Sequence, residues 1–421
     1  MMVISSFSCL SVVSFAATVD SGVETDEFGN VTTTYWKLDD AGTLTVYSDN
    51  EGLEWQKHKD SVKKVVFEEG VTTIANSSFS FFPVLEEVVF KGNLTKIEAG
   101  AFQECDSLKE VIFPGLDSVE EAAFYGCDNL MYVEIHGGWG AVGKNVFKNC
   151  AKLETVVIYN GTAVIGESMF EDCVSLKTAN IPDSVYNIGR LAFENCVSLE
   201  NIYISDGVQT IGAYAFYGCE SAKTLYLGHD ITEVGEYAFG GCSALESVEI
   251  ECSMPIIVDG MFYGCSSLKS LENLPAGIKT IGNFAFANCT AFEKIDLPVT
   301  LEAIGTNAFD STKITSIKIP ANVTTIGSGA FTNCNSLSSI DVDVNNKAYT
   351  SVDGALYDIT CDMLITCPAG KTGEYSIFDG AVEIGGGAFI GCTGLTVVEI
   401  PDSVTTIGDY AFSNCYKLAN I

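Results

Sequence analysis

Apolar residues recur along this chain in two alternating patterns. In the stretch LESVEI, Val248 and Ile250 share one face while Ser247 and Glu249 share the other, which predicts a short half-buried β-strand. In most units a second apolar pair follows, and then an Ile-Gly and an Ala-Phe dipeptide, as in LKTANIPDSVYNIGRLAFENC at residues 176–196. The full pattern is roughly L-x-x-V-x-I-P-x-x-V-x-x-I-G-x-x-A-F-x-x-C. It predicts a strand, a turn, a second short apolar segment and one helical or 3₁₀ turn.

This pattern repeats along almost the whole chain. The phenylalanine near its end, here called the marker phenylalanine, occurs in fourteen copies: Phe79, Phe102, Phe124, Phe147, Phe170, Phe193, Phe216, Phe239, Phe262, Phe286, Phe309, Phe331, Phe389 and Phe412. The intervals are 22 to 24 residues, except for 58 residues between Phe331 and Phe389. A period near 23 lies within the range of about 20 to 29 residues that is typical of leucine-rich repeats.

One unit of this size cannot bury its apolar residues alone, but units stacked in register share a continuous interior. The expected fold class is therefore a leucine-rich-repeat solenoid. It would contain a parallel β-sheet ladder with short helical or 3₁₀ turns, about 14 repeats of about 23 residues, and a small β-rich N-terminal cap. At about 4.8 Å per strand, fourteen repeats give a body on the order of 65 Å long.

Two residue types mark the bends of each unit. Prolines at 182, 298, 320 and 401 remove a backbone donor, so we expect each first strand to end there. The glycine of the Ile-Gly dipeptide suits either a left-handed bend or a tightly packed one. It occurs at positions 189, 212, 235, 282, 305, 327 and 408.

Cysteines occur with the same period. Twelve of the 16 lie three residues after a marker phenylalanine: Cys105, Cys127, Cys150, Cys173, Cys196, Cys219, Cys242, Cys265, Cys289, Cys334, Cys392 and Cys415. The same position holds Phe82 and Thr312 in two other units, so it is not obligatory for metal binding or catalysis. We interpret these cysteines as small buried hydrophobic residues whose weak S–H donors face the turn backbone. The alternatives are a ladder of disulfides or of metal ligands, which the absence of any C-x-x-C pair disfavours.

The period also predicts the domain boundaries. Residues 1–17 carry no charge and end in a small-x-small motif, which indicates a signal peptide whose basic n-region is truncated. Residues 18–60, with Trp36 and Trp55, would form the N-terminal cap, and residues 61–345 the first repeats. Residues 346–378 form an irregular insert with a hairpin turn at Asp353-Gly354, and residues 379–421 contain further repeats.

Two features of the C-terminal part leave alternatives open. Cys361 and Cys367 in the insert either form a disulfide or remain free thiols. The last repeat is incomplete, because the sequence stops where the next strand would begin. We therefore expect the natural protein to continue beyond Ile421.

The charge excludes several classes of function. There are 55 Asp and Glu against 22 Lys and Arg, a net charge of -33, which disfavours binding to nucleic acid or to anionic membrane surfaces. The three histidines are far apart in sequence, which leaves little for histidine-based metal or acid-base chemistry. After the N-terminal segment, no apolar stretch is long enough for a transmembrane segment.

Two short motifs resemble ligand sites. GWGAVG at residues 138–143 matches a dinucleotide-binding pattern, but Val142 and Gly143 occupy the ordinary Ile-Gly position of the repeat. DVDVN at residues 341–345 opens like a calcium loop, but its acids also fit the outward positions of a strand whose inward residues are Ile340, Val342 and Val344. We predict no cofactor, no metal site and no catalytic residues.

The remaining candidate site is the outward face of the first strands. It carries Tyr132 and Glu249 as well as Asn201, Tyr203, Thr224 and Tyr226, and the period would stack Tyr203 on Tyr226 in adjacent repeats. Stacked aromatic residues on a repeated sheet are typical of a binding surface. The competing interpretation is that these are scattered solvated side chains that only support the sheet.

The unit IPDSVTTIGDYAFSNCYKL at residues 400–418 resembles the BspA-like leucine-rich repeats of bacterial and some protist surface proteins. The resemblance covers roughly residues 60–421. It implies a non-enzymatic, secreted or cell-surface protein that binds an extracellular protein or glycan ligand, often in adhesion to host or other cells. The alternatives are a structural spacer or carbohydrate-binding array attached to a downstream enzyme or anchor domain, and a hydrolase that uses carboxylates on the concave face.

Overall fold

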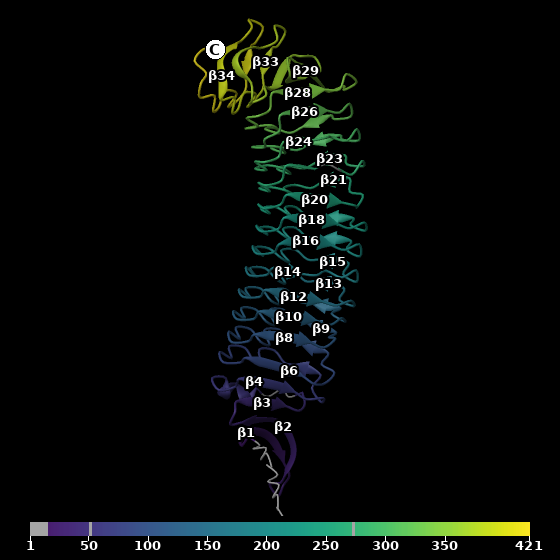
Figure 1. Cartoon of the computed structure of the whole chain (residues 1–421), viewed down its shortest axis with the longest axis vertical. Coiled ribbons are helices and arrows are strands. Elements are labelled where there is room, and N and C mark those ends of the chain that lie inside the picture. Colours follow the sequence, from purple (N-terminus) through teal and green to yellow (C-terminus); the bar gives the residue numbers. More distant parts are fainter. Residues whose placement is uncertain (1–15, 50–52, 272–273) are drawn as a thin grey trace, which may run out of the picture.

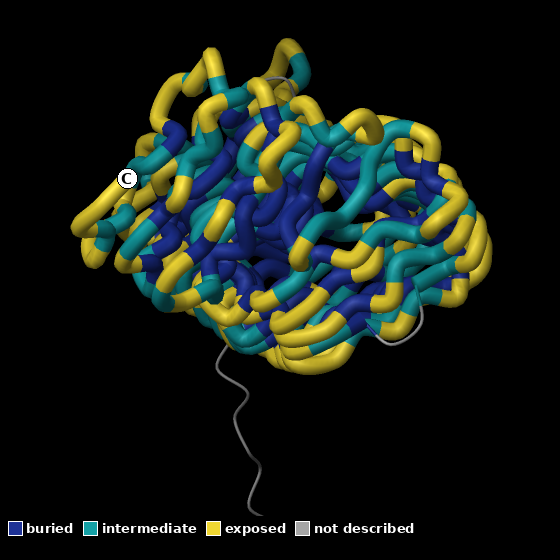
Figure 2. The backbone as a smooth tube through the Cα atoms, turned by 90° about the horizontal axis from the view of Figure 1, so that it is seen from above, coloured by how far each residue is buried: buried dark blue, intermediate teal, exposed yellow. Residues whose placement is uncertain are grey.

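A computed structural model of the chain describes residues 16–49, 53–271 and 274–421. The chain winds into coils that stack along one long axis (Figure 1). Seen along that axis, buried residues occupy the centre and exposed residues the rim (Figure 2). Most of the predicted signal peptide, up to residue 15, lies outside the described residues.

Each coil contributes one strand to a first parallel ladder. Its pairs are in register, as at Tyr203 and Tyr226, and β26 ends at Ile319, directly before Pro320, as predicted. The strands are β4 (Lys64–Phe67), β6 (Glu87–Phe90), β8 (Glu110–Phe113), β10 (Tyr132–Ile135), β12 (Thr155–Ile158), β14 (Thr178–Ala179), β16 (Asn201–Ile204), β18 (Thr224–Leu227), β20 (Ser247–Ile250), β22 (Ser270–Leu271), β24 (Lys294–Ile295), β26 (Ser316–Ile319) and β28 (Ser339–Val342).

A second parallel ladder consists of two-residue strands at the second apolar segment of each coil, which in most coils is followed directly by the Ile-Gly glycine. The strands are β5 (Thr73–Ile74), β7 (Lys96–Ile97), β9 (Ser118–Val119), β11 (Ala141–Val142), β13 (Val164–Ile165), β15 (Asn187–Ile188), β17 (Thr210–Ile211), β19 (Glu233–Val234), β21 (Ile256–Ile257), β23 (Thr280–Ile281), β25 (Ala303–Ile304) and β27 (Thr325–Ile326).

The Ile-Gly glycines after these strands are tightly packed, not left-handed. Gly212 does not have a positive φ, and a Cβ placed on it would lie 2.4 Å from the backbone nitrogen of Arg190 in the preceding coil. The other predicted glycines of this position have equally close backbone neighbours. Glycine is therefore needed here because any side chain would push neighbouring coils apart.

Successive turns form the third side of each coil. The Tyr217 N–H donates to the Tyr214 carbonyl at 3.1 Å, the i→i−3 bond of a 3₁₀ turn. Residues two before and two after every marker phenylalanine have positive φ, for example 59° at Tyr214 and 73° at Gly218. The Tyr214 N–H then donates to Glu236 of the next coil at 2.9 Å. Neighbouring coils are thus hydrogen-bonded on this side as well.

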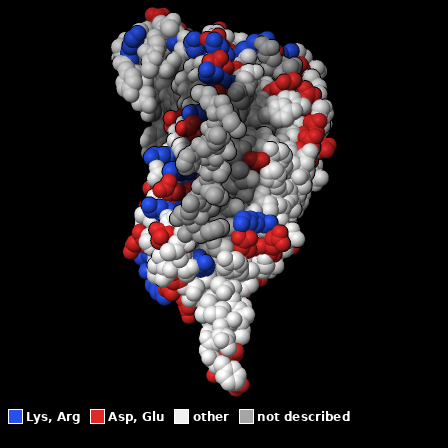
Figure 3. All heavy atoms as spheres, turned by 60° about the horizontal axis from the view of Figure 1, so that its bottom comes forward, with Lys and Arg blue, Asp and Glu red and all other residues white. Residues whose placement is uncertain are grey.

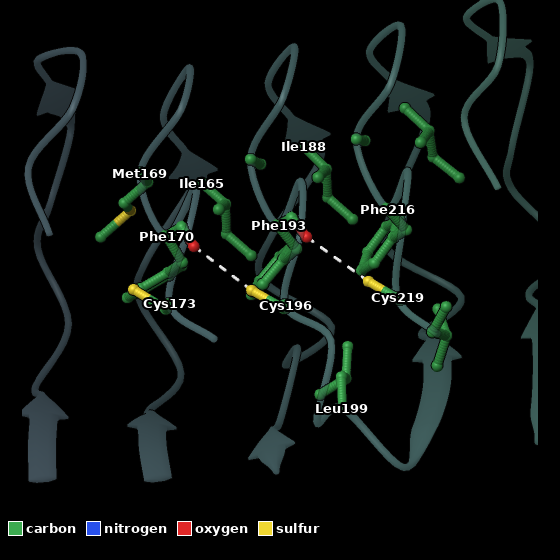
Figure 4. Close-up of a cluster of buried hydrophobic side chains, with 14 of the residues drawn as sticks. Ile165, Met169, Phe170, Cys173, Ile188, Phe193, Cys196, Leu199, Phe216 and Cys219 are labelled. Carbon is green, nitrogen blue, oxygen red and sulfur yellow. Dashed lines mark hydrogen bonds between the residues drawn. The ribbon is translucent and has the colours of Figure 1, made fainter. Parts of the chain in front are cut away.

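The interior consists of stacked marker phenylalanines and the cysteines beside them (Figure 4). The rings of Phe193 and Phe216 are parallel, with centroids 5.0 Å apart. The Cys196 thiol donates to the Phe170 carbonyl of the preceding coil at 3.2 Å, and Cys219 does so to Phe193 at 3.4 Å. The same bond occurs at Cys105, Cys127, Cys150, Cys173, Cys242, Cys265, Cys289, Cys334 and Cys415.

These contacts confirm the interpretation of the cysteines as buried residues with a weak donor. Burial raises the pKa of the Cys242 and Cys289 thiols to about 12. Where threonine replaces cysteine, the Thr312 hydroxyl takes over the donor function and bonds the Phe309 carbonyl of its own coil at 2.8 Å.

The N-terminal part covers the first coil. Strands β1 (Thr18–Thr25), β2 (Val31–Asp39) and β3 (Thr43–Val46) pair antiparallel, and β3 pairs parallel with β4. A 3₁₀ helix, η1 (Glu54–His58), buries Trp55. The Trp55 ring stacks on Phe79 at 5.5 Å and its Nε1 donates to the Ser78 carbonyl at 2.9 Å. The tryptophan thereby continues the phenylalanine stack into the cap.

The insert begins two separate sheets. Strands β29 (Tyr349–Val352) and β30 (Ala355–Asp358) form a hairpin, and its two turn residues, Asp353 and Gly354, both have positive φ. Strand β31 (Met363–Thr366) pairs parallel with β33 (Glu383–Ile384), which pairs parallel with β35 (Thr406–Ile407). Strand β32 (Thr372–Ser376) pairs parallel with β34 (Gly394–Glu399). This C-terminal part has a hydrophobic core of its own and projects to one side of the stack (Figure 1).

The structure decides two expectations for this region. Val344 was expected to point inward, but it is 92% exposed, because β28 ends at Val342. The chain turns there as the Asp343 carboxylate accepts from the Asn345 N–H at 3.0 Å. Cys361 and Cys367 are both free thiols, so the disulfide alternative is wrong.

Candidate binding face

The outward side chains of the first ladder form a surface here called the strand face. Strand alternation places Tyr203 and Tyr226 outward. Ile202 and Leu225, which directly precede them in the two strands, are buried. All six predicted site residues lie on this face. The structure divides them into two groups, with Tyr132 on β10 and the other five on β16, β18 and β20.

The larger group is centred on a tyrosine pair. The rings of Tyr203 and Tyr226 stack with centroids 4.7 Å apart and planes 7° apart, as the period predicts. Tyr203 is 60% exposed. Beside the pair, the Thr224 hydroxyl donates to the Asn201 side-chain oxygen at 2.7 Å. Glu249 lies directly across from Tyr226 on β20. An exposed, rigid aromatic surface of this kind costs little conformational entropy on binding.

The second group surrounds a half-buried carboxylate. Glu134 accepts from the Tyr132 hydroxyl at 3.0 Å and lies 2.9 Å from Nε2 of His136. These hydrogen bonds, and above all the one from Tyr132, lower the pKa of Glu134. The hydrogen bond to Glu134 and then the negative charge of Glu134 raise the pKa of Tyr159. The His136 ring stacks on Tyr159 at 4.4 Å. The group therefore offers a second exposed aromatic pair.

An exposed histidine lies beside the larger group. Nδ1 of His229 is 2.9 Å from Asp206, and Nε2 is 3.9 Å from Glu251. The hydrogen bond from His229 lowers the pKa of Asp206, and the same bond and charge raise the pKa of His229. These three residues follow β16, β18 and β20, so they occupy neighbouring coils at one end of the tyrosine pair.

A groove continues along the strand face toward the insert. It has a volume of about 440 Å³ and is lined by apolar residues of β24 and β26 together with Lys294, Asp296, Lys318 and Asp341. Its charges alternate along the ladder, since Lys318 lies directly across from Asp341. The tyrosine pair and this groove occupy different coils, so the strand face changes its chemistry along the solenoid.

Most ion pairs elsewhere join neighbouring coils. Lys64 reaches Glu87 at 2.7 Å and Lys177 reaches Glu154 at 2.8 Å. In Figure 3, lysines and acidic residues accordingly lie next to one another along one side of the molecule. Exposed pairs of this type contribute little to stability, typically less than about 1 kcal/mol. They leave the excess of acidic residues to set the surface potential.

The described ranges, 16–49, 53–271 and 274–421, contain no cluster of three or more His, Cys, Asp or Glu placed to hold a metal ion. Within those same ranges, no helix is long and apolar enough to cross a membrane. The GWGAVG motif is part of the ordinary coil, because Trp139 is fully buried and Val142 ends β11. The Asp343 carboxylate of the DVDVN motif accepts a hydrogen bond from the Asn345 N–H.

Sequence reasoning missed His136, Tyr159, Asp206 and His229. They lie just beyond the carboxyl ends of β10, β12, β16 and β18 and so fall outside the alternating strand positions. The 23-residue interval between Asp206 and His229, and between His136 and Tyr159, is the signal that could have found them.

Comparison with known proteins gives consistent results. The model of the BspA type leucine rich repeat region matches in 6 copies, at residues 57–177, 187–273, 255–361 and 370–421. No curated protein sequence matches the chain.

Solved structures of bacterial proteins are similar to this chain. A leucine-rich repeat protein from Bacteroides ovatus is 30% identical, over 74% of this chain and 74% of that one, with a TM-score of 0.55. One from Eubacterium ventriosum is 22% identical, over 70% of this chain and 91% of that one, with a TM-score of 0.42. A leucine rich cell surface protein from Faecalibacterium prausnitzii is 22% identical, over 96% of this chain and 76% of that one, with a TM-score of 0.30.

Proposed function

Since the chain belongs to the BspA-type leucine-rich-repeat family, we propose that it is an exported, non-enzymatic protein that binds a protein ligand through its strand face. The observation that carries the proposal is the exposed stack of Tyr203 on Tyr226. Two tyrosines held by neighbouring strands are already ordered, so a ligand that covers them gains contact area at low entropic cost. The Asn201 and Thr224 side chains beside them supply polar contacts.

Binding to a panel of immobilised extracellular-matrix proteins, host-cell proteins and glycans tests this proposal. We expect saturable binding to at least one protein, and a loss of affinity of about tenfold or more in Tyr203→Ala and Tyr226→Ala, in the range of aromatic hot spots. Tyr186→Ala is the matched control, because Tyr186 is 50% exposed but precedes β15 in the second ladder. Equal losses in Tyr186→Ala and Tyr203→Ala, or no saturable ligand, would refute the proposal.

Export to the cell surface, in adhesion to host or other cells, is the second part of the proposal. It is supported by family membership and by the uncharged segment at residues 1–17. Treatment of intact cells with a protease should release fragments of the repeats, while a cytosolic marker protein stays intact. Fragments that appear only after cell lysis would contradict a surface location.

A further inference from the structure

Carboxylates surround the stacked tyrosine pair. Burial and then the charges of Asp206, Glu251 and Glu249 raise the pKa of the Tyr226 hydroxyl. Asp206 and Glu251 lie beyond the ends of β16 and β20, and Glu249 lies across from Tyr226. The ring faces of Tyr203 and Tyr226 are thus framed by acidic groups from the β16 and β20 coils.

The second aromatic pair, His136 and Tyr159, also lies beside carboxylates. Tyr132 lies across from Glu110 of the preceding coil, and Glu134 lies between Tyr132 and His136. After burial and the Glu134 hydrogen bond, the charges of Glu134 and Glu110 contribute to the raised pKa of Tyr132. His136 and Tyr159 present their stacked rings next to these carboxylates, and Tyr159 is 44% exposed.

An aromatic face framed by carboxylates favours one ligand chemistry. The face of a tyrosine ring carries partial negative charge and attracts a guanidinium or ammonium group, and a guanidinium also pairs with carboxylates through two parallel hydrogen bonds. An anionic ligand would be repelled by both features and by the net charge of -33. Charge complementarity therefore selects a basic partner.

The spacing of the two pairs constrains that partner further. One pair lies just beyond β10 and β12 and the other within β16 and β18, so along the ladder their centres are three coils apart. At about 4.8 Å between strands this separation is about 14 Å, which an extended chain spans in about four residues. Side chains at positions i and i+4 of an extended segment point to the same side.

From these observations we infer that the strand face binds an extended, basic segment of a partner protein that lies across the strands. One cationic side chain contacts Tyr203 and Tyr226, and a second, four residues away, contacts His136 and Tyr159. The inference rests on the proposed function, because it names the chemistry of the ligand at the same face.

Synthetic peptides test this inference on the full chain. The first is a Ser/Thr peptide with two arginines four residues apart, the second has its arginines three residues apart, and the third has two glutamates four residues apart. We expect the first peptide to bind at least about fivefold more tightly than the second, because only its arginines reach both pairs. We expect no binding of the third, and weaker binding of the first as the salt concentration rises.

Matched variants separate this inference from the proposed function. Glu249→Gln should weaken the first peptide several-fold, whereas Glu236→Gln, the same change at an exposed residue on the turn side of the adjacent coil, should not. Equal binding of all three peptides would overturn the inference. So would an affinity for the first peptide that Tyr226→Ala leaves unchanged. A panel protein that still loses affinity in Tyr203→Ala would then leave the proposed function intact, with a ligand of different chemistry.

Discussion

The interior of the solenoid and its strand face differ in how much they vary between coils. Inside, each coil from Phe79 to Phe331 adds one more ring to the same stack, and in all but two of these coils a cysteine thiol bonds the preceding coil. On the strand face, neighbouring coils carry different residues, such as Asn180 on one and Tyr203 on the next. Positions that repeat therefore maintain the fold, and positions that do not repeat are free to specify a ligand.

The largest expected effect is a truncation in the stack. Phe193→Ala removes a fully buried ring that stacks on both Phe170 and Phe216. It should lower the free energy of unfolding by about 3 to 5 kcal/mol. Tyr203→Ala lies on the strand face of the next coil. Apart from the lost stacking contact with Tyr226, it should lower the free energy of unfolding by less than about 1 kcal/mol. Urea denaturation measures both, and similar losses would contradict the division between interior and face.

A smaller loss is expected from one added methyl group between coils. In Gly212→Ala the new Cβ meets backbone of Arg190, which cannot move aside as a side chain would. We expect a loss of about 1 to 3 kcal/mol. Gly277→Ala is the control, since a Cβ there has no neighbour within 4 Å, and it should change stability by less than about 0.5 kcal/mol. Thermal denaturation measures the stability of both variants. Equal stabilities would rule out close packing as the reason for the Ile-Gly glycines.

The cysteine row should respond more mildly. Cys196→Ala loses packing and the thiol bond to the Phe170 carbonyl, and should destabilise by about 1 to 2 kcal/mol. Cys196→Thr should lose less, because Thr312 already fills this position in another coil and its hydroxyl bonds a carbonyl. The opposite order in urea denaturation would show that the thiol bond and the polar donor have no role there.

The smallest effect concerns pH on the strand face. His229 lies between Asp206 and Glu251, and Asp230 also contributes to its raised pKa. As the pH rises through this raised value, which is above 6.5, His229 loses its positive charge and leaves the carboxylates free for a cationic ligand. Affinity for the peptide with arginines four apart should rise a few-fold between pH 6 and 8. His229→Gln should reduce this dependence, and a wild-type affinity that falls over this range would contradict the sign.

Much of the fold could be predicted because each coil repeats the same sequence pattern. The period identified the phenylalanine stack and the cysteine row, and it placed Tyr203 on Tyr226. It could not decide the backbone conformation of the third side. There Tyr214 and Tyr237 take a left-handed φ because of their hydrogen bonds to the next coil, a tertiary effect that overrides local preference.

The candidate site was less predictable for a related reason. Alternation along a strand locates outward residues only while the strand continues. Val344 was misplaced and His136 was missed because both lie just beyond a strand end, where the turn sets the direction of the side chain. Whether the six predicted residues bind a ligand remains a prediction.

Side-chain footprinting by hydroxyl-radical oxidation and mass spectrometry tests the central claim most directly, because it reads both faces of the same molecule. Tyr203 and Tyr186 are 60% and 50% exposed, on the first and second ladders. With the ligand found in the binding panel at saturation, the account predicts that oxidation of Tyr203 falls markedly while that of Tyr186 is unchanged. Protection of Tyr186 with Tyr203 still fully oxidised would contradict it.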